Sequence, residues 1–241
     1  MTTEIEEFNG TAIERIVRLT NFALYANEHF KALHDTRNLY LQHRQVYDMA
    51  SFYFQTAIYS HFTYIFIALS KMFCDQDKDA ESSRNLLQKI VNRNDSVYNH
   101  PFDAVEFKST FSDESHTLHF ECPKEAINVI NEELDNWQTK LERIKTLRDK
   151  YYAHMDRKKA ENYTKLFEDN AITMDDIDQL LNLNFTICNC LNSLLRNTTV
   201  HHDVMKAGSL DILAKYAEKG KETDRKEREL ALQQLLNNEN H

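Results

Sequence analysis

Turn-forming residues are scarce in this sequence, and their scarcity limits the folds available to it. The 241 residues include only three glycines and two prolines. Strand-turn-strand architecture and glycine-rich phosphate loops both depend on such residues, so we expect neither. Hydrophobic residues make up 41% of the chain, which is typical of a globular protein with a packed core. The sequence therefore predicts an all-α fold.

The clearest helical pattern runs from Lys124 to about Asp156. Its apolar residues follow one another at steps of three and four: Ile127, Ile130, Leu134, Trp137, Leu141 and Ile144. This heptad-like spacing predicts a seam that packs against other helices. Continued further, the seam reaches Arg148, Tyr151 and Met155. An arginine therefore stands where the repeat requires an apolar side chain.

Other helical patterns lie on either side of this element. They predict helices over about 11–33, 46–73 and 83–91, and one that begins near Thr173. The first carries a loose apolar stripe of Ile13, Ile16, Val17, Phe22, Leu24, Tyr25 and Phe30. Ser83 is the expected N-cap of the third helix, and Thr173 with Asp175 and Asp176 marks the start of the last.

The domain organisation follows from where these patterns stop. The segment 92–121 shows little helical periodicity and is too long for an ordinary connection. We expect residues 1–200 to form one helical domain, with 92–121 as a long irregular insertion. Residues 201–241 include the mixed-charge run EKGKETDRKERE and are expected to form a helical, charged C-terminal extension.

The stretch LRDKYYAHMD carries the candidate chemistry of the chain. Arg148 on a core-facing stripe is costly unless its charge is paired or faces a cleft or a partner. His154 follows six residues later, about 9 Å along an ideal helix and roughly 120° around it. The two side chains would therefore converge only if the helix deforms, or if a two-fold axis lays the seam against a copy of itself.

An arginine and a histidine without a carboxylate cluster suit metal-free phosphodiester chemistry. Arg148 can hold a phosphate with two hydrogen bonds and stabilise the charge that develops on it. His154 can exchange a proton with a ribose 2′-OH or a leaving oxygen. The alternative is structural, namely an Arg–Asp pair at the surface and a histidine at a helix end. Spacing alone leaves both interpretations open.

Charge is unevenly distributed along the chain. The formal net charge of −9 disfavours binding of nucleic acid by bulk charge. Residues 140–165, however, contain nine Lys or Arg against four Asp or Glu, and we call this segment the basic island. The residues expected to contact RNA are Tyr151, Lys150, Arg157, Lys158 and Lys159. A solvated, lysine-rich turn is the alternative.

The motif RDKYYAH resembles the R-x(4–6)-H signature of HEPN domains, a helical family rich in RNases. Residues 65–90, the helix with Trp137 and the final helix resemble the abortive-infection AbiU-like branch, and the likeness covers roughly 39–196. The resemblance implies an all-α HEPN-type bundle with Arg148 and His154 as catalytic pair and Asp149 in support. Some HEPN toxins carry a modifiable tyrosine where this chain has Asp156, so that modification is not expected here.

The resemblance also implies a function and partners. We expect a metal-independent endoribonuclease of phage defence or of a toxin–antitoxin pair, in which attack by the 2′-OH leaves a 2′,3′-cyclic phosphate. A homodimer with a composite active site, an RNA substrate and an antitoxin or defence partner would accompany this activity. The alternative is a non-catalytic HEPN module that binds nucleotides, RNA or another protein.

The remaining motifs carry weaker predictions. His116, His119, Glu121 and Cys122 could bind a metal in a hydrolase, but an extended strand would point the two histidines to opposite faces. We therefore expect no metal or cofactor. Four cysteines are too few for a disulfide scaffold, and they are expected to be free thiols in the cytoplasm. The start MTTEIEEFNG predicts no signal peptide, and the apolar run FTYIFIAL is too short to span a membrane.

Overall fold

The chain forms two compact units in the computed structural model. The first unit comprises Met1–Phe30 and Phe62–His202, and the second comprises Lys31–His61 and Asp203–His241. The structure describes residues 2–75, 82–91, 104–110, 115–119, 123–152, 163–196, 215, 217–223 and 225–229. Each unit is treated by itself below.

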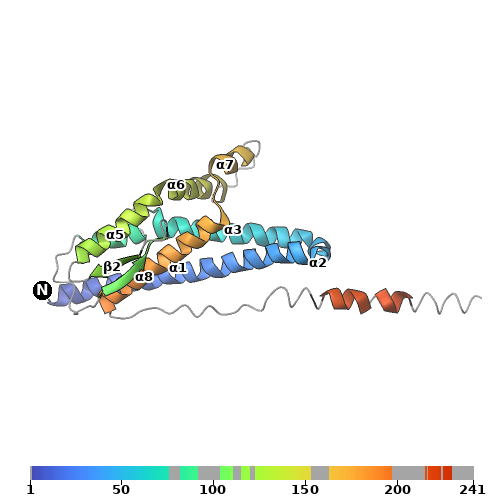
Figure 1. The fold of residues 1–241 in the computed structure, drawn as a ribbon, viewed down its shortest axis with the longest axis horizontal. Helices are drawn as coiled ribbons and strands as arrows, with labels where there is room; N and C mark the ends of the chain where they lie inside the picture. Colours follow the sequence, from blue (N-terminus) through green and yellow to red (C-terminus); the bar gives the residue numbers. More distant parts are fainter. Residues whose placement is uncertain are drawn as a thin grey trace, which may run out of the picture. The chain divides into compact units, whose positions relative to one another are not determined.

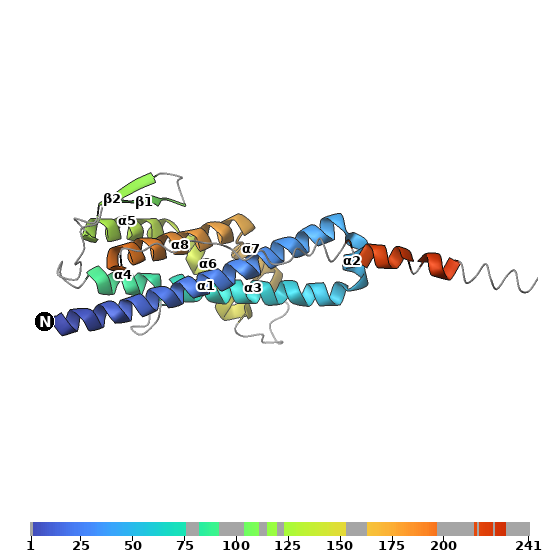
Figure 2. The ribbon, with the colours of Figure 1, turned by 90° about the horizontal axis from the view of Figure 1, so that it is seen from below.

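The described residues are mostly helical, which confirms the all-α class (Figures 1 and 2). The helices are α1 (Thr2–Gln42), α2 (Arg44–Met49), α3 (Ser51–Phe73), α4 (Ser83–Val91), α5 (Pro123–Asn136), α6 (Gln138–Leu147), the π-helix η2 (Arg148–Tyr152), α7 (Tyr163–Asp169) and α8 (Met174–Arg196). In the first unit α1 packs along α3, where His29 stacks on Tyr64 with ring centroids 4.2 Å apart.

The seam of α5 and α6 is buried as predicted. Its six apolar residues are at most 3% exposed: Ile127, Ile130, Leu134, Trp137, Leu141 and Ile144. The helix is interrupted at Trp137, which forms a turn between α5 and α6 and remains in the core. A single chain covers this face completely. The apolar seam therefore gives no reason of its own to seek a second copy.

The buried face of α1 differs from the predicted stripe. Five residues of the first unit form it at steps of four and three: Ala12, Ile16, Leu19, Ala23 and Ala26. Val17 and Tyr25, which belong to the loose apolar stripe of the sequence, are 44% and 61% exposed. Alanine contributes little to a hydrophobic pattern, but its small side chain lets neighbouring helices approach closely. The loose apolar stripe therefore does not coincide with the buried face of α1.

The insertion 92–121 contains a small antiparallel sheet that was not expected. Strand β1 (Ala104–Lys108) pairs with β2 (Ser115–His119), so that Phe107 lies opposite His116. The strands lie beside α8 and α5 in the first unit (Figure 2). The scarcity of glycine and proline did not prevent this hairpin, because a pair of five-residue strands needs only one connection.

Glu133 of α5 ties the hairpin to the helical core. Its buried carboxylate accepts hydrogen bonds from Ser109 Oγ at 2.7 Å, from the backbone N–H of Thr110 at 2.8 Å and from Thr110 Oγ1 at 3.0 Å. Phe107, two residues before Ser109, is fully buried. The hairpin is therefore held to the helices by the buried side chain of Phe107 and by the hydrogen-bonded carboxylate of Glu133.

Side chains cap α4 and α8 at their N-termini. Ser82 caps α4, since its Oγ accepts the N–H of Asn85 at 3.4 Å, whereas the predicted cap Ser83 donates to Asn184 Oδ1 at 3.1 Å. The predicted start of α8 is confirmed as a capping box. There the N–H of Asp176 donates to Thr173 Oγ1 at 3.0 Å, and the N–H of Thr173 donates to the Asp176 carboxylate at 2.9 Å.

The cysteines that the structure describes are free, as predicted, and they are also buried: Cys74, Cys188 and Cys190. Burial raises the pKa of Cys74 to about 11 and that of Cys188 and Cys190 to about 12. These thiols stay protonated at neutral pH and are structural residues. Cys122 lies outside the described residues.

The second unit has few buried side chains. Within it α2 buries none, and the exposed large apolar residues are Tyr40, Leu41, Met49, Phe52 and Tyr53. The described residues of the C-terminal extension, 215, 217–223 and 225–229, are helical and exposed. His43 Nδ1 is hydrogen-bonded to Glu218 Oε1 at 2.7 Å, and Lys221 Nζ donates a hydrogen bond to Gln45 Oε1 at 3.3 Å.

Candidate active site

Arg148 lies where the helix changes its hydrogen-bonding pattern. The α-helical part ends at Leu147, and Arg148 opens the π-helix η2, with its N–H shared between the carbonyls of Ile144 and Lys145. A π-turn is wider than an α-turn and changes the direction of the following side chains, and such turns are frequent at functional sites. The deformation that convergence of Arg148 and His154 would require thus begins at Arg148 itself.

Two carboxylates hold the Arg148 guanidinium. Nε donates to Asp149 Oδ1 at 2.7 Å, and Nη1 donates to Asp75 Oδ1 at 2.7 Å. The side chain of Arg148 is 19% exposed, against 33% for Asp75 and 48% for Asp149. The seam position is therefore half-buried, and the charge of Arg148 is paired within its own chain, which leaves both interpretations of this arginine open.

The ion pairs keep Arg148 charged. Burial lowers the pKa of its guanidinium, but the hydrogen bonds to Asp149 and Asp75 outweigh that effect and raise the pKa above its ordinary value. Nη2 makes no hydrogen bond to any residue in the part of the chain that the structure describes. A permanent cation with a donor to spare can bind a phosphate oxygen.

Asp75 is held from its backbone. It follows α3, and its carbonyl accepts a 2.6 Å hydrogen bond from Ser82 Oγ, the cap of α4. The preceding residue, Cys74, donates its thiol to the carbonyl of Leu141 in α6 at 3.4 Å. The contact between Arg148 and Asp75 thus joins the end of α3 to the end of α6.

Asp149 was singled out in the sequence, but Asp75 was not. Asp75 lies 73 residues before Arg148, in the acidic run CDQDKDAESS, where its carboxylate resembles its neighbours. No helical spacing relates the two positions. Only the packing of α3 against α6 brings them together, so the sequence contained no signal for this pair.

The remaining predicted site residues divide into two groups. Lys150 is exposed in η2, and Tyr151 packs edge-on against Phe167 of α7, with ring centroids 4.7 Å apart. Tyr151 therefore has a packing role whether or not it contacts RNA. The predicted residues outside the described part of the chain are His154, Arg157, Lys158 and Lys159.

The predicted metal alternative gains no support from the described residues. His116 and His119 belong to strand β2, and Glu121 and Cys122 lie outside the described part. Among the residues that the structure describes, no three His, Cys, Asp or Glu side chains gather to bind a metal.

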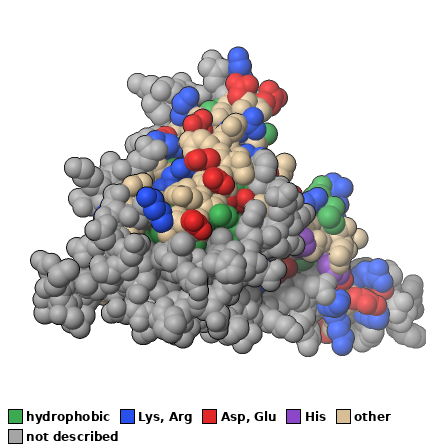
Figure 3. Space-filling view, turned by 60° about the vertical axis from the view of Figure 1, so that its left-hand side comes forward, with side chains coloured by type: hydrophobic (Ala, Val, Ile, Leu, Met, Phe, Trp, Pro, Cys, Tyr) green, Lys and Arg blue, Asp and Glu red, His purple; other side chains and the backbone are tan. Residues whose placement is uncertain are grey.

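On one face of the molecule, basic and acidic side chains are interspersed among the described residues (Figure 3).

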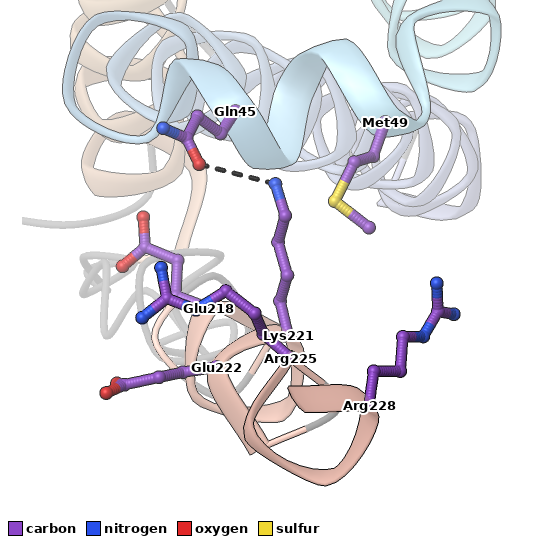
Figure 4. A pocket seen from close by; sticks show the side chains of 7 residues that line it. All are labelled: Gln45, Met49, Glu218, Lys221, Glu222, Arg225 and Arg228. Carbon is purple, nitrogen blue, oxygen red and sulfur yellow. Dashed lines mark hydrogen bonds between the residues drawn. The ribbon is translucent and has the colours of Figure 1, made fainter. Parts of the chain in front are cut away.

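Described residues line a cavity in each of the two units. In the first unit a cavity of about 120 Å³ is lined by Phe73, Cys74, Arg84, Gln138, Leu141, Glu142 and Lys145. In the second unit an open cavity of about 670 Å³ lies between α2 and the C-terminal helical residues, where Lys221 reaches Gln45 (Figure 4). Acidic and basic side chains both line the larger cavity, so it has no single charge preference.

Comparison with known families decides the identity of the fold. The HEPN family model described as AbiU2 matches residues 12–216. The chain belongs to the HEPN AbiU2 family. The match confirms the family resemblance noted in the sequence and extends it beyond residues 39–196 at both ends.

Membership of the AbiU2 family indicates a nuclease-like module related to defence by abortive infection. No curated protein and no solved structure matches the chain. No helix among the described residues is long and apolar enough to cross a membrane.

Proposed function

We propose that this AbiU2 protein is a metal-independent endoribonuclease in which Arg148 and His154 form the catalytic pair. The observation that carries the proposal is the Arg148 guanidinium, held half-buried at the start of η2 by carboxylates from two parts of the chain. Family membership supplies the nuclease-like context. A surface cation of no function would not need a position on an otherwise apolar seam.

The proposed reaction balances without a metal or cofactor. The ribose 2′-oxygen attacks the neighbouring phosphorus, the O2′–P bond forms and the P–O5′ bond breaks, which leaves a 2′,3′-cyclic phosphate and a 5′-OH. Arg148 stabilises the additional charge on the phosphate oxygens. His154 exchanges a proton with the 2′-oxygen or the leaving 5′-oxygen. Asp149 supports the pair by holding Arg148 before RNA binds.

The proposed assembly is a homodimer with a composite site that binds RNA. Lys150, Arg157, Lys158 and Lys159 would contact phosphates without reading bases, and Tyr151 would lie beside the bound strand. The proposed dimer rests on the family, because the seam is already covered within one chain. The proposed RNA contact rests on Nη2 of Arg148, which bonds none of the described residues. An antitoxin or another defence component is the proposed regulatory partner.

The first experiment follows cleavage of a structured RNA in excess EDTA and identifies the new ends. We expect cleavage to persist and to yield 2′,3′-cyclic phosphates, and both Arg148→Ala and His154→Ala to abolish it. Arg84→Ala is the matched control, because Arg84 also pairs with an aspartate, Asp135 at 2.9 Å, and is 28% exposed. Cleavage that requires a metal, or full activity in either variant, contradicts the proposal.

A non-catalytic module is the second candidate, and one observation favours it. Among the described residues, the single positive charge of Arg148 is hydrogen-bonded to two carboxylates, and the negative charge left over in this group of three opposes a phosphate. RNA that binds the wild-type protein and stays intact under every metal and pH condition would support this candidate over the nuclease.

A further inference from the structure

We propose that Asp75 is a positioning residue that keeps the Arg148 guanidinium in place while Asp149 yields its place to an RNA phosphate. The inference rests on the proposed nuclease function and adds a division of labour between the two carboxylates. Asp75 is the fixed partner and Asp149 is the exchangeable one. The evidence is the geometry of the guanidinium and the different anchoring of the two aspartates.

The guanidinium presents two edges to a ligand. Nε and Nη2 share one edge, and Nη1 and Nη2 share the other. Asp149 occupies Nε, and Asp75 occupies Nη1. Nη2 is therefore common to both edges, and either edge becomes available for a bidentate phosphate as soon as one aspartate leaves.

Asp149 is the aspartate that can leave at lower cost. It is the next residue along η2, and its side chain is 48% exposed, so water can replace the guanidinium. An exposed ion pair of this kind contributes little stability. Its departure opens the edge formed by Nε and Nη2, which matches two phosphate oxygens, and removes the excess negative charge at the same time.

Two hydrogen bonds hold the backbone at Asp75, one at its own carbonyl and one made by the preceding residue. Its backbone carbonyl accepts a hydrogen bond from the fully buried Ser82, and Cys74 before it bonds the Leu141 carbonyl. Its side chain is 33% exposed and reaches a different element of the fold. Loss of this carboxylate would free Nη1 and let the guanidinium turn, whereas loss of Asp149 would leave the anchor intact.

The two aspartates should therefore differ in their effects on the cleavage rate constant and on RNA affinity. Asp75→Ala should lower the rate constant for cleavage of bound RNA about 100-fold, the cost of a misplaced catalytic group, with a much smaller change in RNA affinity. Asp75→Asn keeps an oxygen acceptor for Nη1 and should recover part of the rate. Asp149→Asn should bind RNA more tightly than wild type, because a neutral side chain competes less with the phosphate.

The test measures single-turnover cleavage and the binding of an RNA that cannot be cleaved because it carries 2′-O-methyl groups. Asp135→Ala is the control, since Asp135 forms an ion pair with Arg84 across α4 and α5 and should leave both quantities unchanged. Wild-type rates in Asp75→Ala, or equal loss of RNA affinity in both aspartate variants, would overturn the division of labour. Circular dichroism melting verifies that each variant is folded.

A measurement without RNA distinguishes the failure of this inference from the failure of the proposed function. In protein labelled with ¹⁵N-arginine, the side-chain signals of Arg148 are identified by their absence in Arg148→Lys. Restricted rotation of the guanidinium in wild type, lost in Asp75→Ala and retained in Asp149→Asn, is expected even if the protein cleaves no RNA. Equal mobility of Arg148 in wild type and Asp75→Ala would show that Asp75 positions nothing.

Discussion

The ion pairs of Arg148 and those of the second unit differ in how their partners are placed. In the second unit Arg44 lies 3.7 Å from Asp48 and Arg225 lies 3.6 Å from Glu229, each one helical turn apart, and both arginines are 71% exposed. In the first unit Arg148 reaches Asp75 at 2.7 Å from another part of the fold and is 19% exposed. Similar residue types thus form a solvated helix face in one region and a restrained cation in the other.

This contrast identifies what marks Arg148 as a candidate catalytic group. Exposed pairs within a helix contribute well under about 1 kcal/mol and hold neither side chain in a unique place. A half-buried arginine with an anchored partner has lost much of its rotamer freedom before any ligand arrives. Such preorganisation is what an electrostatic catalyst requires.

The largest expected difference between the two regions is in packing. Leu134→Ala should lower the free energy of unfolding by about 2–5 kcal/mol, because it removes a fully buried side chain from the seam. Phe52→Ala in the second unit should change it by less than about 0.5 kcal/mol, since Phe52 is 83% exposed. Urea unfolding of both variants measures the difference. Equal losses would mean that Phe52 is covered in the folded protein.

The next difference concerns a carboxylate at a helix end. Burial raises the pKa of Asp176, but the bonds from Lys140 and Thr173 outweigh it, so that the pKa lies below its ordinary value. The stabilisation it provides is present above about pH 4 and is lost as the pH falls through the lowered pKa. Asp176→Asn should therefore cost about 1 kcal/mol at pH 7 and little in strong acid.

Asp48→Asn is the control for this pH dependence, because Asp48 is 60% exposed and pairs with Arg44 within one helix. We expect no measurable change in stability at any pH where the protein stays folded. Thermal melts between acid and neutral pH make the comparison. A cost of Asp176→Asn that is independent of pH would contradict the assigned role.

A smaller effect is expected when Arg148 is replaced by the residue type that the repeat requires. Arg148→Leu should keep or raise the free energy of unfolding by up to about 1 kcal/mol while it removes RNA cleavage. Asp75 is 33% exposed, so water can solvate it once its partner is gone. Chemical denaturation with a parallel cleavage assay tests both parts. A strong loss of stability would make the Arg148–Asp75 pair structural.

The smallest effect concerns the basic island. Lys150→Gln should lower the slope of log affinity against log salt by about 1 for a single-stranded or duplex RNA, as expected for one lost phosphate contact. Lys219→Gln in the second unit, where Lys219 is exposed, should leave the slope unchanged. The reverse result would place the RNA path along the C-terminal extension.

Sequence reasoning succeeded where a local pattern determines the structure. The seam from Ile127 to Ile144 and the capping box of Thr173 and Asp176 depend on residues a few positions apart, and both are present. The sequence contained no signal where small residues form a buried face or where residues distant in the chain come into contact. Ala23 in the core of α1 carries a weak hydrophobic signal, and the partner of Arg148 lies 73 residues away.

The candidate site could be predicted only in part for the same reason. The motif RDKYYAH predicts Arg148, Asp149 and His154 as site residues, because these positions lie in one short stretch. The packing of α3 and α6 determines the burial of Arg148, the π-helix that begins there and the contact with Asp75. Such three-dimensional contacts leave no regular spacing in a single sequence.

The most direct test of the central claim is the cleavage rate at saturating enzyme, in EDTA, for Arg148→Ala beside Arg44→Ala. Removal of a preorganised donor to the developing charge should slow cleavage by about 10²–10³-fold or more in the first variant. Removal of a solvated arginine with its own aspartate should leave the rate unchanged. Equal rates in the two variants would contradict the proposal that Arg148 performs phosphate chemistry.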